Sequence, residues 1–275
     1  MAMTDMRKRS SGIMWFLFVF AVAGAAAAWF VLDPGLRNPH EAAADNIVSN
    51  AAFDKRVREY LLANPEVIVE AVQGLEARQR EAEATEAQAA LSARASEVFR
   101  DPDSPVGGNP QGDVTMVEFF DYNCPYCRQV APVMREAESG DRQLRIVYKE
   151  FPILGPGSVF AAKAALAAHR QGRYTAFHIA LMQAKGKVGE ATVLQAAADV
   201  GLDVDRLRRD MGDPKVQAAI DRNVALAQSL RINGTPGFVI GDQVLRGATD
   251  LATMKTLIAQ ARATTDTPLA QEGKN

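Results

Sequence analysis

The chain has 275 residues, 48% hydrophobic and 23% charged, with a formal net charge of −2 at pH 7. This composition is that of an ordinary globular protein with one or two domains. The net charge is close to zero and the sequence has no basic stripe, so there is no electrostatic reason to expect nucleic acid as a partner. Only two cysteines are present, which excludes a scaffold held together by many disulfides.

The N-terminus contains a targeting signal. A basic segment at residues 1–12 precedes an uncharged run at residues 13–32, which is long enough to cross a bilayer as one helix. Because basic flanks stay in the cytoplasm, the rest of the chain should lie outside it. A cleaved signal peptide is the alternative, since the run contains small-residue cleavage sites. We favour the anchor, which predicts attachment to the periplasmic face of the inner membrane. Cleavage would leave a soluble periplasmic protein.

Two helices are predicted after a linker at residues 33–44. Residues 45–100, which we call the arm, are rich in Ala, Glu, Arg and Gln. Asn64-Pro65-Glu66 is a typical helix start, with an N-cap residue, a proline in the first turn and an acid after it. The arm carries one narrow apolar stripe at helical spacing (Val57, Tyr60, Leu61, Ile68, Ala71, Val72, Leu75). Because this stripe cannot bury a core alone, we expect self-association, rather than docking on the domain that follows. Residues 76–99 would then form a polar stalk.

A second domain is predicted at residues 113–263, between a Pro/Gly-rich linker at 101–112 and a disordered tail at 264–275. Its expected elements are a strand, a helix, a strand, a helical block, two short strands and a helix (114–120, 125–139, 144–148, 158–231, 237–240, 244–246, 250–262). This order indicates an α/β fold, in which a small mixed sheet has helices on both faces. The helical block at 158–231 would be an insertion.

The two cysteines lie in the sequence Cys124-Pro125-Tyr126-Cys127, where a predicted strand leads into a helix. Free N–H groups and the helix dipole stabilise an anion in a first helical turn. We therefore expect Cys124 to ionise more readily than a free cysteine and to act as the nucleophile. Cys127 lies one turn further along the same side. The pair can form a disulfide, and Cys127 can resolve a mixed disulfide formed at Cys124.

Two other readings of the cysteine pair are weaker. A zinc site needs about four ligands, and the chain has no second C-x-x-C and no suitably spaced histidine pair. An inert structural disulfide is disfavoured by the proline within the pair and by the strand-to-helix context. We therefore predict neither a metal nor a cofactor.

Three motifs resemble the DsbA branch of the thioredoxin-fold proteins: VEFFDYNCPYC, YKEFPILG and NGTPGF, in that order over about residues 113–262. The resemblance implies a thioredoxin-like fold with a helical insertion, and thiol–disulfide oxidoreductase activity. It also implies that Thr235-Pro236 forms a cis-proline loop beside the cysteines. In that family the residue before the proline pairs with an extended substrate as an added strand. From the residues alone, Gly234 to Gly237 would read as an ordinary turn.

Glu118 is the charged residue of an otherwise largely apolar strand. A carboxylate there is costly unless it is paired or functional, and the resemblance implies the family's buried acid beneath the cysteines. We expect Lys149 to be its partner, so that the two relay a proton to or from Cys127. The alternative is a carboxylate at a strand edge that faces solvent.

Two further likenesses bear on the direction of the reaction. Between the cysteines, this chain has Pro125-Tyr126 where the best-known oxidases of this branch have Pro-His, and the residues at these two positions tune the redox potential. Pro125 and Tyr126 are also candidate substrate contacts. The stretch YLLANPEVIVEAVQGLEARQ at residues 60–79 resembles the oligomerisation arm of the ScsC-type (suppressor of copper sensitivity) subgroup. Some members of that subgroup are trimeric disulfide isomerases. We therefore favour isomerase or reductase activity slightly over oxidation.

The predicted partners are extracytoplasmic proteins with thiols or disulfides, a membrane redox protein that resets the cysteines, and further copies of this chain, for example in a trimer. Two alternatives come from other functional classes. A reduced cysteine pair could bind Cu(I), which prefers thiolates. The chain could also be a structural oligomer of the cell envelope in which the redox fold is vestigial.

Overall fold

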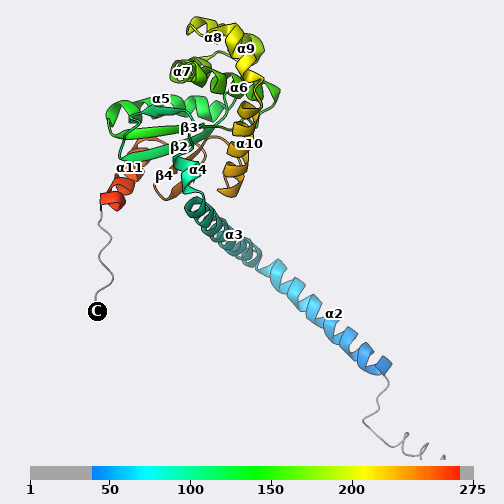
Figure 1. The fold of residues 1–275 in the computed structure, drawn as a ribbon. Helices are drawn as coiled ribbons and strands as arrows, with labels where there is room; N and C mark the ends of the chain where they lie inside the picture. Colours follow the sequence, from blue (N-terminus) through cyan, green and yellow to red (C-terminus); the bar gives the residue numbers. More distant parts are fainter. Residues whose placement is uncertain (1–38, 267–275) are drawn as a thin grey trace, which may run out of the picture. The chain divides into compact units, whose positions relative to one another are not determined.

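The computed structural model describes residues 39–266, and side chains are described for residues 50–264 (Figure 1). The predicted membrane segment at 13–32 lies outside these ranges. Among the helices of residues 39–266, none combines the length and apolar character that a membrane span requires. The linker predicted at residues 33–44 extends too far, because residues 39–44 already belong to helix α2 (Pro39–Ala63). Their alanines and glutamate suit a helix better than a loop.

The chain divides into two compact units, residues 1–75 and 76–275. In the described part of the first unit, α2 is followed by the start of α3 (Glu66–Ala93). The predicted break between them is confirmed at Asn64-Pro65. The Asn64 backbone N–H and side-chain amide both donate to the carbonyl of Tyr60, at 2.8 and 2.9 Å. The apolar stripe of the arm is largely exposed within the single chain: Tyr60, Ile68, Val72 and Leu75 each expose about half of their surface.

The second unit is built on a five-stranded sheet of order β1-β3-β2-β4-β5. Its strands are β1 (Val106–Gly108), β2 (Val114–Phe120), β3 (Leu144–Glu150), β4 (Gly237–Ile240) and β5 (Gln243–Arg246). The central pair, β2 and β3, is parallel, and the other pairs are antiparallel. The predicted strands are confirmed, with β3 two residues longer than expected. Strand β1 lies within the stretch predicted as the linker 101–112, so that linker is shorter than predicted.

Helices cover both faces of the sheet, as predicted (Figure 1). Residues of even number on β2, among them Met116 and Phe120, belong to one buried cluster with side chains of α5 (Pro125–Gly140), α7 (Tyr174–Gln183) and α11 (Leu251–Asp266). Odd-numbered residues, among them Val117 and Phe119, belong to a second cluster with α10 (Pro214–Ser229). The predicted helical block contains α10 together with α6 (Pro156–Arg170), α7, α8 (Glu190–Asp199) and α9 (Val204–Met211).

The C-terminal part of the arm differs from the predicted polar stalk. Ala87 and Leu91 at the end of α3 and Val98 of α4 (Ala95–Phe99) are buried, and Leu91 and Val98 join the second cluster beneath the sheet. Arg94 also donates to the carbonyl of Ala225 and the hydroxyl of Ser229. Ala87 and Leu91 are four residues apart and therefore lie on one face of α3, which is the buried face of this otherwise polar helix. The last turns of the arm are therefore part of the second unit.

The last element, α11, extends slightly beyond its predicted end and includes residues 264–266 of the predicted tail. The rest of that tail, residues 267–275, lies outside the described residues. The architecture as a whole brings the C-terminal end of β2 and the N-terminus of α5 together at one edge of the sheet. The two cysteines lie at this junction.

Candidate active site

Cys124 is the N-cap residue of α5, and its side chain accepts a hydrogen bond from the backbone N–H of Cys127 at 3.4 Å. Its own N–H donates to the carbonyl of Asp121 at 3.0 Å. The thiol of Cys124 donates to the carbonyl of Thr235 at 3.2 Å. Both cysteines are buried free thiols in this structure. The Cys124 sulfur therefore lies between an amide that favours a thiolate and a carbonyl that accepts from a thiol.

The Thr235-Pro236 loop contains a cis peptide bond and lies beside Cys124, as the family resemblance implied. It leads directly into β4, whose residues Gly237 and Phe238 pair with Phe119 and Glu118 of β2. This pairing fixes the loop against the end of the strand that leads to the cysteines.

The residues between and beside the cysteines form an exposed apolar rim. Tyr126 exposes 62% of its surface, and Pro125 is also exposed. Ile153 and Leu154 expose 41% and 45%, and the N–H of Leu154 donates to the carboxylate of Asp121 at 2.9 Å. Pro125 and Tyr126 follow Cys124 directly, and exposed aromatic and aliphatic groups of this kind suit contact with another protein.

Glu118 is buried on the α5 side of the sheet and exposes only 2% of its surface. Burial raises the pKa of its carboxyl group from 4.5 to about 8. The alternative of a solvent-facing carboxylate at a strand edge is therefore wrong, because β2 lies at the centre of the sheet. The pKa of Cys127 is also raised, first by burial and then by the charge of Glu118. An ionised Glu118 therefore disfavours the thiolate form of Cys127.

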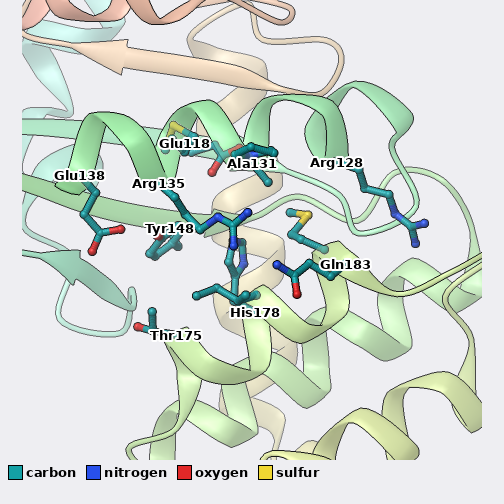
Figure 2. Close-up of a pocket in the computed structure, with 13 residues that line it drawn as sticks. Glu118, Arg128, Ala131, Arg135, Glu138, Tyr148, Thr175, His178 and Gln183 are labelled. Atoms are coloured by element: carbon teal, nitrogen blue, oxygen red, sulfur yellow. The ribbon is translucent and has the colours of Figure 1, made fainter. Parts of the chain in front are cut away.

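A cavity of about 60 Å³ opens beside Glu118. Figure 2 shows Glu118 of β2, Arg135 of α5 and His178 of α7 directed toward it. This volume exceeds the roughly 10–15 Å³ that one water molecule requires, and its walls carry polar groups. Water can therefore reach the buried carboxyl group. His178 is itself buried, which lowers its pKa to about 3 and keeps its ring neutral.

The predicted pairing of Glu118 with Lys149 is wrong. In the parallel register Glu118 is opposite Tyr148, and Phe119 is opposite Lys149. Because side chains alternate across a strand, the two charged groups point to opposite faces of the sheet. The Lys149 ammonium instead donates to the carbonyl of Glu97 at 2.8 Å and the carboxylate of Asp101 at 2.9 Å. Lys149 therefore ties α4 and the segment after it to the sheet, on the face opposite Glu118.

Glu150 is a second buried carboxyl group, and it was not predicted as a site residue although it lies in the YKEFPILG motif. Its Oε1 accepts hydrogen bonds from the hydroxyls of Tyr122 and Tyr174, at 3.0 and 2.8 Å. The Tyr122 hydroxyl also lies 3.2 Å from Nδ1 of His178. Burial raises the pKa of Glu150, although both tyrosine hydrogen bonds oppose the shift. A charged residue next to a predicted strand end was the available signal.

Residues 115–259 match the family described as the DSBA-like thioredoxin domain, which is more than half of the chain. The chain belongs to the DSBA-like thioredoxin family. Residues 50–82 of the arm match a second family, the copper resistance protein ScsC N-terminal domain. Both matches agree with the two resemblances seen in the sequence.

Solved structures of DSBA-like proteins share the fold. A thioredoxin-like oxidoreductase from Silicibacter pomeroyi is 50% identical, with a TM-score of 0.60, over 61% of this chain and 97% of that one. ScsC from Proteus mirabilis in a transitional conformation is 26% identical, with a TM-score of 0.60, over 79% of this chain and 99% of that one.

Curated relatives include the Na(+)/H(+) antiporter NhaA 1 of Salinispora arenicola, which is 32% identical over 168 residues. That match covers 60% of this chain and 26% of the antiporter. The chain thus spans about a quarter of the length of these antiporter relatives.

Proposed function

We propose that this chain is a thiol–disulfide oxidoreductase that acts on extracytoplasmic protein disulfides through Cys124 and Cys127. One observation carries the proposal: the Cys124 sulfur caps α5, accepts the N–H of Cys127 and touches the carbonyl of Thr235. A thiolate at this position is stabilised by the helix N-terminus. The resolving thiol lies on the same helix one turn away.

The reaction is a pair of thiol–disulfide exchanges. The Cys124 thiolate attacks one sulfur of a client disulfide, forms a mixed disulfide and releases the other client sulfur as a thiolate. Cys127 then loses its proton and attacks the Cys124 sulfur, which releases the second client thiolate. The client gains two electrons, and the chain ends as a Cys124–Cys127 disulfide. The reverse sequence oxidises a client dithiol.

In its ionised form, Glu118 would accept the proton that Cys127 loses, and in its protonated form it would return one. Cys127 belongs to the buried cluster on the α5 side of the sheet, the side that Glu118 also faces, and the charge of Glu118 raises the pKa of Cys127. A carboxyl group with a pKa of about 8 can both hold and release a proton near neutral pH. The cavity in Figure 2 would let water exchange this proton with solvent. Lys149 takes no part, since it lies on the opposite face.

Clients would bind across the exposed rim around Cys124. The backbone of Thr235, which already contacts Cys124, would pair with an extended client segment as an added strand. Pro125 and Tyr126 are exposed beside the sulfur and would contact the client side chains. The basic N-terminus and the apolar run at 13–32 support a periplasmic location at the inner membrane. A membrane redox protein would reset the cysteines there.

The arm would assemble copies of this chain into a homo-oligomer, of which a trimer is one example. The exposed apolar stripe on α2 and α3 supports this proposal, since isolated apolar stripes of this kind are covered in stable assemblies. Several active sites held around one misfolded client favour isomerisation. We therefore place isomerase and reductase activity ahead of net oxidation.

The test compares reductase activity and the repair of a scrambled disulfide client in two variants. Deletion of residues up to 75 removes the exposed stripe but keeps the part of the arm that packs on the sheet. Val72→Lys places a charge on the stripe within an intact arm. We expect both variants to become monomeric, to keep reductase activity and to lose client repair. Repair at the unmodified rate by a monomer would contradict the role of the arm.

Cu(I) capture is a second candidate, favoured by two free thiols on one helix turn and by the copper-resistance description of the family matched at 50–82. Thiolates are the ligands that Cu(I) prefers. Copper binding by a chain that does not exchange disulfides would support it over the enzyme. A structural role in the envelope would instead be supported by a Cys124→Ala variant with full biological activity.

A further inference from the structure

The side chain of Asn123, the residue before the nucleophile, is held by the loop between α7 and α8. Its Oδ1 accepts the N–H of Val188 at 2.8 Å, and its Nδ2 donates to the carbonyl of the same residue at 3.0 Å. Nδ2 also donates to the hydroxyl of Ser158 at 3.1 Å. Only an amide offers a donor and an acceptor side by side, so neither Asp nor Ser could replace this pairing.

The chain makes room for this contact at Gly157, on the first turn of α6. A Cβ atom at that position would lie 2.5 Å from the carbonyl oxygen of Val188, which real side chains do not tolerate. The loop and α6 can approach each other only because the position is glycine. The same glycine lies next to Ser158, the third partner of the Asn123 amide.

Arg128 provides a second connection to the same loop from the other side of Cys124. Its Nη1 donates to the carbonyls of Ala184 and Gly186, both at 2.9 Å, and its Nε donates to the carbonyl of Tyr122 at 2.8 Å. In Figure 2 the Arg128 side chain points away from Arg135 and His178. The planar guanidinium thus joins the residue two before Cys124 to the loop.

We propose that Asn123 and Arg128 are positioning residues, which hold Cys124 where its sulfur meets the Cys127 N–H and the Thr235 carbonyl. The inference rests on the proposed thiol–disulfide function and adds to it the α7–α8 loop, residues 184–189, as the support of the nucleophile. Both anchors flank Cys124 in the chain, and both bind backbone groups of that one loop. A turn fixed from both sides keeps the reacting sulfur aligned with its stabilising amide.

The test measures how fast iodoacetamide alkylates Cys124 as a function of pH, with the site of labelling identified by mass spectrometry. We expect Asn123→Ala to move the alkylation profile to higher pH and to slow disulfide exchange with glutathione about tenfold. Arg128→Lys keeps the positive charge but loses the planar guanidinium with its several donors. It should shift the alkylation profile and slow disulfide exchange in the same direction as Asn123→Ala.

Asn109→Ala is the matched control. Asn109 also takes part in three side-chain hydrogen bonds, but with residues 111, 142 and 143 at the opposite end of the sheet. We expect this variant to match the unmodified chain in both measurements. If Asn123→Ala does not fold, Asn123→Asp keeps the size and the acceptor while it removes the donor, and is measured instead.

An Asn123 variant whose alkylation profile and exchange rate equal those of Asn109→Ala would overturn the inference. This failure is separable from failure of the proposed function. An unmodified chain that never exchanges disulfides refutes the function, whereas an active chain that is indifferent to Asn123 refutes only the positioning role.

Discussion

Replacement of Glu118 by glutamine should make the chain more stable at neutral and alkaline pH. Glu118 exposes only 2% of its surface, and burial raises its pKa from 4.5 to about 8. At pH 7 the folded chain therefore holds this carboxyl group protonated, whereas the unfolded chain releases the proton to water. Glutamine has a similar shape and remains neutral in both states.

The size of the effect follows from proton linkage. Between pH 4.5 and 8 the unfolded state binds fewer protons at this position than the folded state, so the free energy of unfolding falls as pH rises. The slope is about 1.4 kcal/mol per pH unit for one such group. The unmodified chain thus loses about 3 kcal/mol between pH 4.5 and 7, and about 4 kcal/mol between pH 4.5 and 9. The glutamine variant avoids this loss.

Urea unfolding of both reduced proteins at about pH 4.5, 7 and 9 measures the difference directly. The advantage of Glu118→Gln should be small at the lowest pH and grow by the stated amounts. Glu136→Gln, on an exposed position of α5, is the matched control and should differ from the unmodified chain by a constant amount. A Glu118→Gln difference that stays the same from pH 4.5 to 9 would show that Glu118 does not retain its proton on folding.

Three further outcomes follow from the structure. Asp101→Asn removes the carboxylate that offsets burial of the Lys149 ammonium, so the free energy of unfolding should fall by about 3 kcal/mol. The control Asp103→Asn breaks the exposed ion pair with Arg222 and should lower the free energy of unfolding by less than about 1 kcal/mol. Equal losses for the two variants in urea titrations would contradict this prediction. His178 has its pKa lowered to about 3 by burial, so the unfolded state binds more protons below pH 6.5 and stability should fall with acidity. His178→Gln should weaken that acid sensitivity in thermal melts; an unchanged slope argues against it. Tyr126→Ser removes an exposed aromatic group beside Cys124 and should raise KM for a protein client while the rate with glutathione changes little; a loss confined to glutathione would exclude client contact.

Much of the fold could be predicted from local sequence. The run from Val114 to Phe120 is largely apolar and is followed by a proline inside a helix start, so both the strand and the position of the cysteines follow from short-range rules. The NGTPGF motif indicated the loop beside Cys124. These features depend on neighbours within a few residues, which a single sequence displays.

What could not be predicted depends on contacts between distant segments. Glu118 and Lys149 looked like partners, but their strands pair in a register that sends them to opposite faces. Strand spacing alone does not reveal that register. The Asn123 contact joins residues 65 positions apart, and a lone asparagine carries no local sign of it. Leu91 was predicted to lie in a polar stalk, because its burial depends on the sheet residues that pack against it in the second cluster.

The most direct test of the whole account identifies which sulfur a client binds. In Cys127→Ala the second exchange cannot occur, so a disulfide-bonded client peptide should remain attached to the chain. Digestion and mass spectrometry then locate the link. We expect the client on Cys124, whose sulfur meets the Cys127 N–H and the Thr235 carbonyl, and release on addition of dithiothreitol. A variant that traps no client, while Cys124→Ala traps it through Cys127, would contradict the central claim.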